Sequence, residues 1–446
     1  MQIQYTRPIL PRLLLYVSIL LWIYAFWTSI NCLTPAFEDL RNRVTGARLM
    51  KDGIDPYLFI WKSGLPVRYY DCFLPQNLPF SLATATPAFH WLLSPLAELS
   101  QYQINVAWFA LEWGSVLAIV FFARKLVTTE LNKNLISFTA ALLCLTSGFK
   151  QHIFQGQLYL FVPALMMVAI WLIEKQKSLV AYFIGGLCLT LVFFIRPTFL
   201  LLLAPLILYK QSRPFVLASF LSVVAYVSFV CFSPTQKQSW NSYIKSIQFY
   251  SGSPVSIGEK TAAENPMPFK ISEGLHFDIH INDLAYATSY VGQDEISNYY
   301  LIHKKLTGQL PSTLLLTILQ GICIVVGAIA ILWFKKKQPS FGLLEALCLA
   351  AISMWCFDFC TFVGKALYNV VLLFYPIMLL FCRQNRLKPL ALTLLFIGIL
   401  MNFKQVSFIT MPETVGQMMM LLSIFIQCAE WPYLKFRSKT KIDFCY

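Results

Sequence analysis

Long apolar runs recur along the chain from residue 13 to residue 434, separated mostly by short polar segments. Runs of this length match the thickness of a bilayer core, where a backbone must satisfy its own hydrogen bonds, as a helix does. Charged residues make up 13% of the chain, whereas soluble domains carry about 25%. The pattern excludes a soluble enzyme and predicts an all-α polytopic integral membrane protein, with residues 1–446 forming a single membrane domain.

Lysine and arginine residues gather in the short segments between the apolar runs. The net charge is +14, and clusters of this kind are typical of cytoplasmic loops. No nucleic-acid-binding motif accompanies them, so the charge indicates topology and not a nucleic-acid partner. The clusters fall at Arg7 and Arg12, at 124–133, at Lys175 and Lys177, at Lys210 and Arg213, at 335–337, at 383–388 and at 435–441.

If every basic cluster is cytoplasmic, consecutive clusters must be separated by an even number of crossings. Between Arg12 and Arg124 lie three apolar runs, and the one at 79–97 contains several prolines, so we predict that it does not cross. The other runs then give about twelve transmembrane helices with both termini inside. Two regions are expected outside, 32–103 and 234–310. Hydropathy alone would also permit about thirteen crossings.

The first external region contains a predicted amphipathic helix. Thr34 is a suitable N-cap and Gly53 a suitable stop, and apolar residues between them recur at spacings of three and four. Such a helix would lie at the membrane surface. Either solvent covers its charged face, or a carboxylate stands there beside cations that could hold a phosphate. The charged residues are Glu38, Asp39, Arg41, Arg43, Arg48 and Lys51.

Several short motifs occur along the chain in the order found in one known family. Asp39 precedes Gly46-Ala47-Arg48 and the stretch Asp52-Gly53-Ile54-Asp55-Pro56-Tyr57, just after the first apolar run. This opening resembles glycosyltransferase family 87 of the GT-C class, whose members are polytopic enzymes that use polyprenyl-phosphate sugars. The similarity covers about residues 10–230. The later matching motifs are 85–89 with 94–96, then Gly156-Gln157, then Arg196-Pro197-Thr198.

The resemblance implies a GT-C fold with external amphipathic helices and a hexosyltransferase activity. The donor would be a polyprenyl-phosphate sugar, by analogy carrying mannose, and the acceptor a glycolipid or a cell-envelope glycan. The reaction would take place on the external face of the plasma (inner) membrane. Asp39 would be the catalytic base, taking the proton from the acceptor hydroxyl that attacks the anomeric carbon.

The leaving phosphate in such a reaction carries charge that cations must stabilise. Arg196 is the strongest candidate, because an arginine at a turn between two apolar helices is costly unless it is paired or functional, although it could also reach the membrane interface. Tyr57, Gln157 and Asn369 are the residues expected to line the substrate. The candidate phosphate-binding residues are Arg41, Arg43, Lys150, Arg196 and Lys365.

One late segment departs from the family. Its members usually carry a histidine in a "W-x-H" segment, and here 366–370 stands in that place, with Asn369 nearest in register. Because of this difference, the resemblance does not determine which donor and which acceptor the protein uses. Asp358 lies seven residues before Lys365, two helical turns away on the same face, where it is either functional or structurally paired.

Two further patterns lie in the external regions. His276, Asp278 and His280 alternate as on one face of a strand, but three ligand types without a known spacing favour an exposed strand over a divalent metal site. We therefore expect no metal and no cofactor. Cys32 and Cys72 could pair in an oxidising compartment.

Two rival functions fit a polytopic membrane protein of this composition. One is a transporter or flippase of lipid-linked glycans, and the other is a polysaccharide polymerase or ligase that uses a pyrophosphate-linked donor. A carrier predicts charged residues in the middle of the membrane and paired broken helices. Polar residues here gather instead at the external ends of the apolar runs, which favours the glycosyltransferase.

Overall fold

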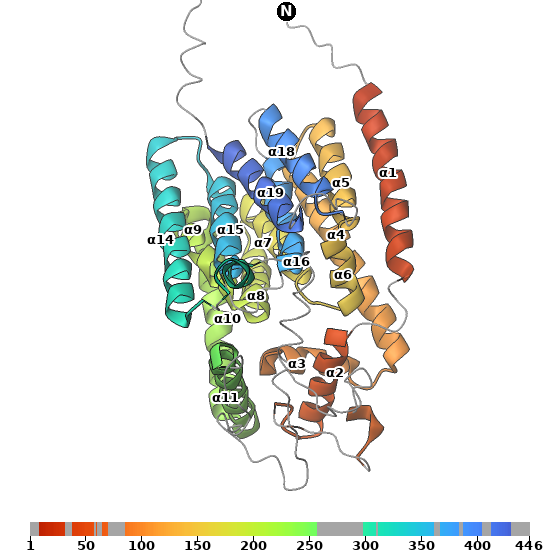
Figure 1. Cartoon of the computed structure of the whole chain (residues 1–446), viewed down its shortest axis with the longest axis vertical. Coiled ribbons are helices and arrows are strands. Elements are labelled where there is room, and N and C mark those ends of the chain that lie inside the picture. Colours follow the sequence, from red (N-terminus) through yellow and green to blue (C-terminus); the bar gives the residue numbers. More distant parts are fainter. Residues whose placement is uncertain are drawn as a thin grey trace, which may run out of the picture.

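The computed structural model describes ten separate parts of the chain, and every regular element in them is a helix. The predicted all-α fold is therefore confirmed for these parts. Figure 1 shows a bundle of roughly parallel and antiparallel helices with smaller helices at one end. The described residues are 9–31, 38–57, 59, 65–69, 85–256, 298–308, 311–360, 366–382, 387–403 and 412–429.

The bundle contains both long and short helices. The long ones are α1 (Ile9–Ile30), α4 (Gln101–Leu126), α10 (Arg213–Phe232) and α14 (Thr313–Lys337). Those of intermediate length are α5 (Glu130–Cys144), α7 (Phe161–Lys175), α8 (Leu179–Ile195), α15 (Leu343–Phe359), α18 (Pro389–Leu400) and α19 (Pro412–Cys428). The short ones are α6 (Ser147–Gln155), α9 (Leu203–Leu208), α16 (Ala366–Leu372) and α17 (Phe374–Cys382), with the 3-10 turns η4 (Pro197–Leu202) and η5 (Lys210–Ser212).

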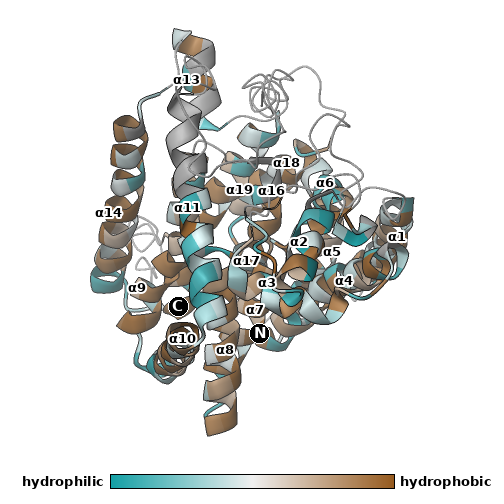
Figure 2. Ribbon diagram, turned by 90° about the horizontal axis from the view of Figure 1, so that it is seen from below, coloured by the Kyte–Doolittle hydropathy of each residue, from teal (hydrophilic) through white to brown (hydrophobic). Residues whose placement is uncertain are grey.

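The two regions predicted to be external contain four described helices. They are α2 (Glu38–Lys51), α3 (Pro87–Leu93), α11 (Pro234–Ser256) and α13 (Tyr299–Thr307), with the turns η2 (Val67–Tyr69) and η3 (Ser94–Leu96). Figure 1 shows α2, α3 and α11 below the bundle, and Figure 2 shows that hydrophilic residues are frequent on them. The segment predicted not to cross is described from residue 85, and there it forms only α3 and η3, which are too short to span a bilayer.

Four helices are long and apolar enough to cross a membrane: Leu10–Ile30, Tyr102–Leu126, Lys210–Phe232 and Leu314–Lys337. Other apolar runs are interrupted. Thr146 caps α6 and so separates it from α5, and Pro376 has no N–H with which to continue α16 into α17. The structure thus supports a polytopic membrane protein, and the count of about twelve crossings stays a prediction.

The basic segments meet at the end of the bundle away from α2 and α3. They occupy the last turns of α4, α7 and α14. Hydrogen bonds also connect helices at this end: Lys335 Nζ donates to the Leu208 carbonyl oxygen at 2.9 Å, and Asn134 Nδ2 donates to the Pro11 carbonyl oxygen at 2.8 Å. In Figure 1, α14 ends at the top of the bundle, whereas α2, α3 and α11 lie at the bottom. The basic last turns of these helices therefore lie at the end of the bundle opposite α2, α3 and α11.

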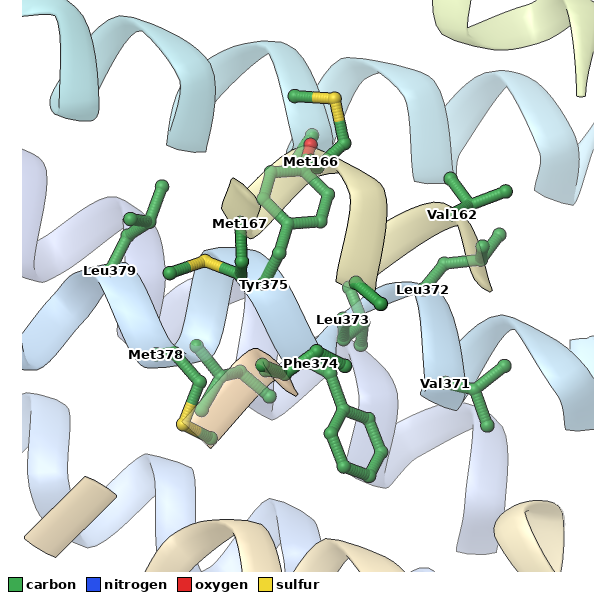
Figure 3. Packing of buried hydrophobic residues seen from close by; sticks show 14 of the residues in the cluster. Val162, Met166, Met167, Val371, Leu372, Leu373, Phe374, Tyr375, Met378 and Leu379 are labelled. Carbon is green, nitrogen blue, oxygen red and sulfur yellow. The ribbon is translucent and has the colours of Figure 1, made fainter. Parts of the chain in front are cut away.

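The core lies where α7 packs against α16 and α17. Met166, Met167, Phe374 and Tyr375 are fully buried there (Figure 3). Methionine side chains are unbranched and fill irregular gaps between helices. Because lipid tails are as apolar as these side chains, the association of the helices rests on close van der Waals packing and on polar contacts. Polar contacts within the bundle are accordingly informative about its function.

Candidate active site

The amphipathic helix predicted in the first external region is present as α2. Gly53 has φ +75°, a left-handed conformation that ends the helix as expected. Leu40 and Val44 on its apolar stripe are buried. Arg41 and Arg43 on its charged face are also buried, with 5% and 6% of their surfaces exposed. This part of the charged face packs against the protein and is not covered by solvent.

Arg43 connects α2 to the end of α6. Its Nη1 donates to the Gly156 carbonyl oxygen at 3.1 Å, and its Nη2 donates to Gln157 Oε1 at 2.9 Å. Gly156 has φ +63°, a left-handed conformation that ends α6 and is readily adopted by glycine. The Gly-Gln motif thus has a physical role, since it turns a carbonyl and an amide oxygen toward one guanidinium. The structure brings together two of the predicted site residues, Arg43 and Gln157.

His90 on α3 packs directly on α2. Its ring lies against Gly46, where a side chain would overlap it. His90 Nδ1 donates to the Arg43 carbonyl oxygen at 3.0 Å. Burial lowers the pKa of His90 to about 4, so the ring is neutral at physiological pH. Its Nε2 atom is buried and has no hydrogen-bond partner within the described residues.

A buried acid and a buried histidine lie behind Arg43. Glu112 of α4 and His152 of α6 are both fully buried, and Glu112 Oε1 is 3.4 Å from His152 Nδ1. The Leu160 N–H donates to His152 Nε2 at 3.2 Å, which leaves the proton of the neutral ring on Nδ1, facing the carboxyl group. Neither residue was expected at the site from the sequence. A lone acid inside the apolar run of α4 was the available signal.

Arg196, at the end of α8, forms a second cationic centre with residues from three other segments. Its Nη2 and Nε atoms donate to Asp358 Oδ2 at 2.6 and 3.2 Å. Its guanidinium carbon lies 4.7 Å from the centre of the Tyr159 ring, a cation–π contact. Nη2 also reaches Asn369 Oδ1 at 3.5 Å. The predicted Arg196 and Asn369 therefore lie together, and Asp358 is paired with Arg196.

The two cationic centres share one turn of the chain. Gln157 accepts from Arg43, and Tyr159, two residues later, lies against Arg196. The rings of Tyr159 and His152 are also neighbours, with centres 6.4 Å apart. The shared turn therefore places two guanidinium groups in one part of the bundle, each held in place by its contacts with the protein.

Tyr57 joins the two external regions. Its hydroxyl donates to the Ala85 carbonyl oxygen at 2.8 Å, and its ring packs against those of His90 and Tyr243 of α11, with centres 5.9 and 5.3 Å away. Burial raises the pKa of Tyr57, which keeps its hydroxyl protonated as a donor. Only 7% of the residue is exposed, so its contacts are mainly with the protein.

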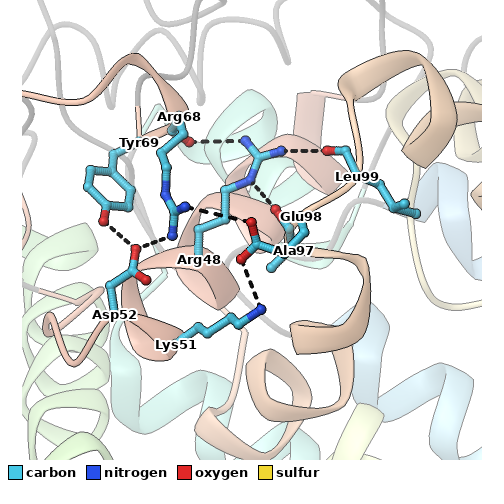
Figure 4. Close-up of polar contacts among 8 residues, drawn as sticks. All are labelled: Arg48, Lys51, Asp52, Arg68, Tyr69, Ala97, Glu98 and Leu99. Carbon is cyan, nitrogen blue, oxygen red and sulfur yellow. Dashed lines mark hydrogen bonds and ion pairs between the residues drawn. The ribbon is translucent and has the colours of Figure 1, made fainter.

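A polar network fixes the far end of α2 (Figure 4). Arg48 donates through its three guanidinium nitrogens to the carbonyl oxygens of Ala97, Arg68 and Leu99, at 2.8, 3.0 and 3.1 Å. Lys51 pairs with Glu98 at 2.9 Å, and Asp52 bonds Arg68 and Tyr69. The hydrogen bond from Tyr69 and the nearby Arg68 lower the pKa of Asp52. Arg48, part of the family-like motif, thus holds the external loops together.

Other predicted site residues stand apart or lie outside the description. Lys150 is half-buried on α6, and no contact joins it to Arg43 or Arg196 among the residues described. Asp39 lies in the first turn of α2, where the backbone but not its side chain is described. The described residues hold no cluster of three metal-ligating side chains. Outside the described residues lie Thr34, Lys365, the pair Cys32 and Cys72, and the pattern His276, Asp278 and His280.

Comparison with known proteins finds one match. No curated protein and no solved structure matches the chain. The family model of glycosyltransferase family 87 matches residues 84–358, more than half of the chain. This range begins after Asp39 and contains the Gly-Gln turn, Arg196 and Asp358, which is its last residue. The chain, with its membrane helices and paired guanidinium sites, therefore belongs to glycosyltransferase family 87 and is a glycosyltransferase.

Proposed function

We propose that this enzyme transfers a hexose, with mannose the first candidate, from a polyprenyl-phosphate sugar to a glycolipid or a cell-envelope glycan. The reaction takes place on the external face of the plasma membrane. The single observation that carries the proposal is the pair of ordered guanidinium groups, Arg43 and Arg196, at the bundle end where α2 and α3 lie. A membrane-anchored donor presents its phosphate at that depth, and an acceptor glycan arrives from water.

In the proposed reaction, Asp39 is the general base. The acceptor oxygen attacks the anomeric carbon while its proton passes to the Asp39 carboxylate, and the bond from the anomeric carbon to the phosphate oxygen breaks with its electron pair on that oxygen. Asp39 and Arg43 are four residues apart on α2 and so share one helix face. Arg43 points from this face into the protein, which supports a base on the same side.

The phosphate released in this step needs positive charge around it. Arg196 and Arg43 are the primary candidates, and Arg41, Lys150 and Lys365 are further ones. Tyr57, Gln157 and Asn369 are proposed to line the substrate. Gln157 and Asn369 support this through their contacts with the two guanidinium groups.

The sharpest test of the base is Asp39→Asn. Asparagine is nearly isosteric but cannot accept the proton at neutral pH, so transfer should fall by about 10²- to 10⁴-fold, the usual contribution of general-base catalysis. Glu38→Gln is the matched control, because position 38 lies about 100° away around the helix. We expect Glu38→Gln to keep most of the activity. Near wild-type turnover in Asp39→Asn, or loss of activity in Glu38→Gln alone, would reject Asp39 as the base.

The donor class is tested with purified protein in detergent. Polyprenyl-phosphate mannose, the glucose analogue and a pyrophosphate-linked sugar are each supplied with a glycolipid acceptor, and release of the lipid phosphate is measured. We expect turnover with a monophosphate donor only. Turnover with the pyrophosphate-linked donor alone would assign the protein to the polymerase or ligase class instead.

A further inference from the structure

Asn369 carries a buried amide donor that has no hydrogen-bond partner among the residues that the structure describes. The residue is 3% exposed, and its Nδ2 atom is buried with no hydrogen-bond partner within the described residues. A guanidinium can only donate, so the contact with Arg196 Nη2 fixes Oδ1 toward Arg196 and Nδ2 away from that bond. Burying an amide donor without a hydrogen-bond partner costs free energy. Such a donor beside a cation indicates that a ligand with a negatively charged hydrogen-bond acceptor binds there.

The guanidinium of Arg196 is held in one orientation. Asp358 occupies its Nε–Nη2 edge, and the Tyr159 ring lies against one face. Because the group is planar, Nη1 lies on the far side of the group from the edge that Asp358 occupies. The Arg196 side chain keeps 17% of its surface exposed, whereas Asp358 keeps 3%. The Arg196 side chain as a whole thus keeps some exposed surface, and its Nη2 atom lies beside Asn369.

We propose that Asn369 Nδ2 and Arg196 form a two-donor site for a phosphate oxyanion, in which Asp358 and Tyr159 are positioning residues. The inference rests on the proposed function in identifying that anion as the phosphate of the lipid donor. Arg196 supplies charge and Asn369 supplies a neutral donor of fixed direction. Asp358 offsets the charge of Arg196 when the site is empty, so a buried cation is tolerated there.

Binding to the purified full-length protein tests the site directly. The probes are geranylgeranyl monophosphate, inorganic phosphate and geranylgeraniol, which separate the lipid from the phosphate contribution. We expect the monophosphate to bind, inorganic phosphate to compete weakly, and the alcohol to fail to compete. Equal competition by the alcohol, or no binding of either phosphate to the wild type, overturns the proposal.

Asn369→Leu isolates the amide donor. A hydrogen bond to a charged group is lost in this variant, so the Kd for the monophosphate should rise about tenfold or more. The melting temperature should stay the same or increase, because the donor that is removed has no partner among the described residues. Asn134→Leu is the matched control: Asn134 is also buried, but its Nδ2 bonds the Pro11 carbonyl oxygen at the other end of the bundle. It should lower the melting temperature and leave binding unchanged.

Asp358→Asn tests the role of Asp358 by removing its negative charge while keeping an acceptor for Arg196. The amide oxygen can still accept from Arg196, but the site gains one net positive charge when empty. Binding of the monophosphate should become tighter and more sensitive to salt, whereas a purely structural role predicts weaker binding. Weaker binding in Asp358→Asn, or unchanged binding with a lower melting temperature in Asn369→Leu, contradicts the inference.

The sugar-transfer assay separates this inference from the proposed function. If wild-type protein transfers the sugar and Asn369→Leu binds and turns over normally, the oxyanion site is wrong while the function stands. If no donor supports transfer but Asn369→Leu still loses monophosphate binding, the site stands and the proposed reaction is wrong.

Discussion

At the residue scale, buried polar side chains do most to define the candidate site. Arg43, His90 and Asn369 each make a bond that fixes their direction. Glycines act alongside them by allowing close approach or a left-handed turn. Gly46 gives room to the His90 ring, and Gly156 turns the chain toward Arg43.

Gly46→Ala should destabilise the contact between α2 and α3. The added Cβ would overlap the His90 ring, and overpacking of this kind costs about 1–3 kcal/mol. Gly114→Ala is the control, because Gly114 lies within α4 with nothing close to its Cβ position, and alanine favours a helix by about 1 kcal/mol. Thermal unfolding in detergent should show a lower melting temperature for Gly46→Ala only. An equal change of melting temperature in Gly46→Ala and Gly114→Ala would contradict the packing argument.

Asp52 should make the external loops sensitive to acid. Its pKa is lower in the folded protein than in the unfolded chain, because Tyr69 and Arg68 bond its charged form. The stabilisation is therefore complete above the unfolded pKa of about 4 and is lost as the pH falls through the lower folded pKa. Thermal stability measured between about pH 6 and pH 3 should drop less steeply in Asp52→Asn. Identical pH profiles for variant and wild type would refute this role.

At the scale of elements, the site depends on how α2 docks on the end of α6. α2 carries the proposed base and Arg43, while α6 ends in the turn that receives Arg43 and leads to Tyr159. A shift of α6 would disturb both cationic centres, whereas a shift of α2 would displace Arg43. The Arg48 network holds α2 from its other end.

Gly156→Ala tests this docking. A left-handed alanine costs about 1–2 kcal/mol, and relief of that strain would move the carbonyl that Arg43 binds. Gly53→Ala carries the same strain at φ +75° but lies in open space beyond α2. We expect similar losses of melting temperature in the two variants and a much larger loss of transfer activity in Gly156→Ala. Equal activity in both would show that the turn does not position the site.

At the scale of the whole molecule, the two ends of the bundle differ in charge and in chemistry. Basic helix ends gather at one end, and the candidate site with α2, α3 and α11 lies at the other (Figure 1). From the positive-inside rule we predict that the basic end is cytoplasmic. The candidate site is then predicted to face outward.

Cysteine labelling of intact cells checks this orientation. A reporter at Thr128, in the exposed turn between α4 and α5, should be protected from an impermeant maleimide until the membrane is opened. A reporter at Ser100, the exposed N-cap of α4, should react from outside. The labelling of each reporter is compared with that of the protein without the reporter, because the native cysteines can also be labelled. The reverse labelling pattern would invert the topology.

The helical class and α2 with its stop at Gly53 were predictable from the sequence, because they follow from local periodicity and turn chemistry. The partners of Arg43 and Arg196 were not, since Gly156 lies 113 residues from Arg43 and Asp358 lies 162 residues from Arg196. Glu112 and His152 were missed for the same reason, as their pairing depends on how α4 and α6 pack.

The sequence by itself determined that this protein is a helical membrane protein with family-like motifs, because hydropathy and spacing act over a few residues at a time. Only the tertiary structure decided that Arg41 and Arg43 are buried, that Asp358 neutralises Arg196, and that the Asn369 amide donor meets no acceptor within the described part of the chain. Within a membrane, apolar surfaces alone do not select one arrangement of helices. Close packing and long-range polar pairing select it, and they exist only once the helices have come together.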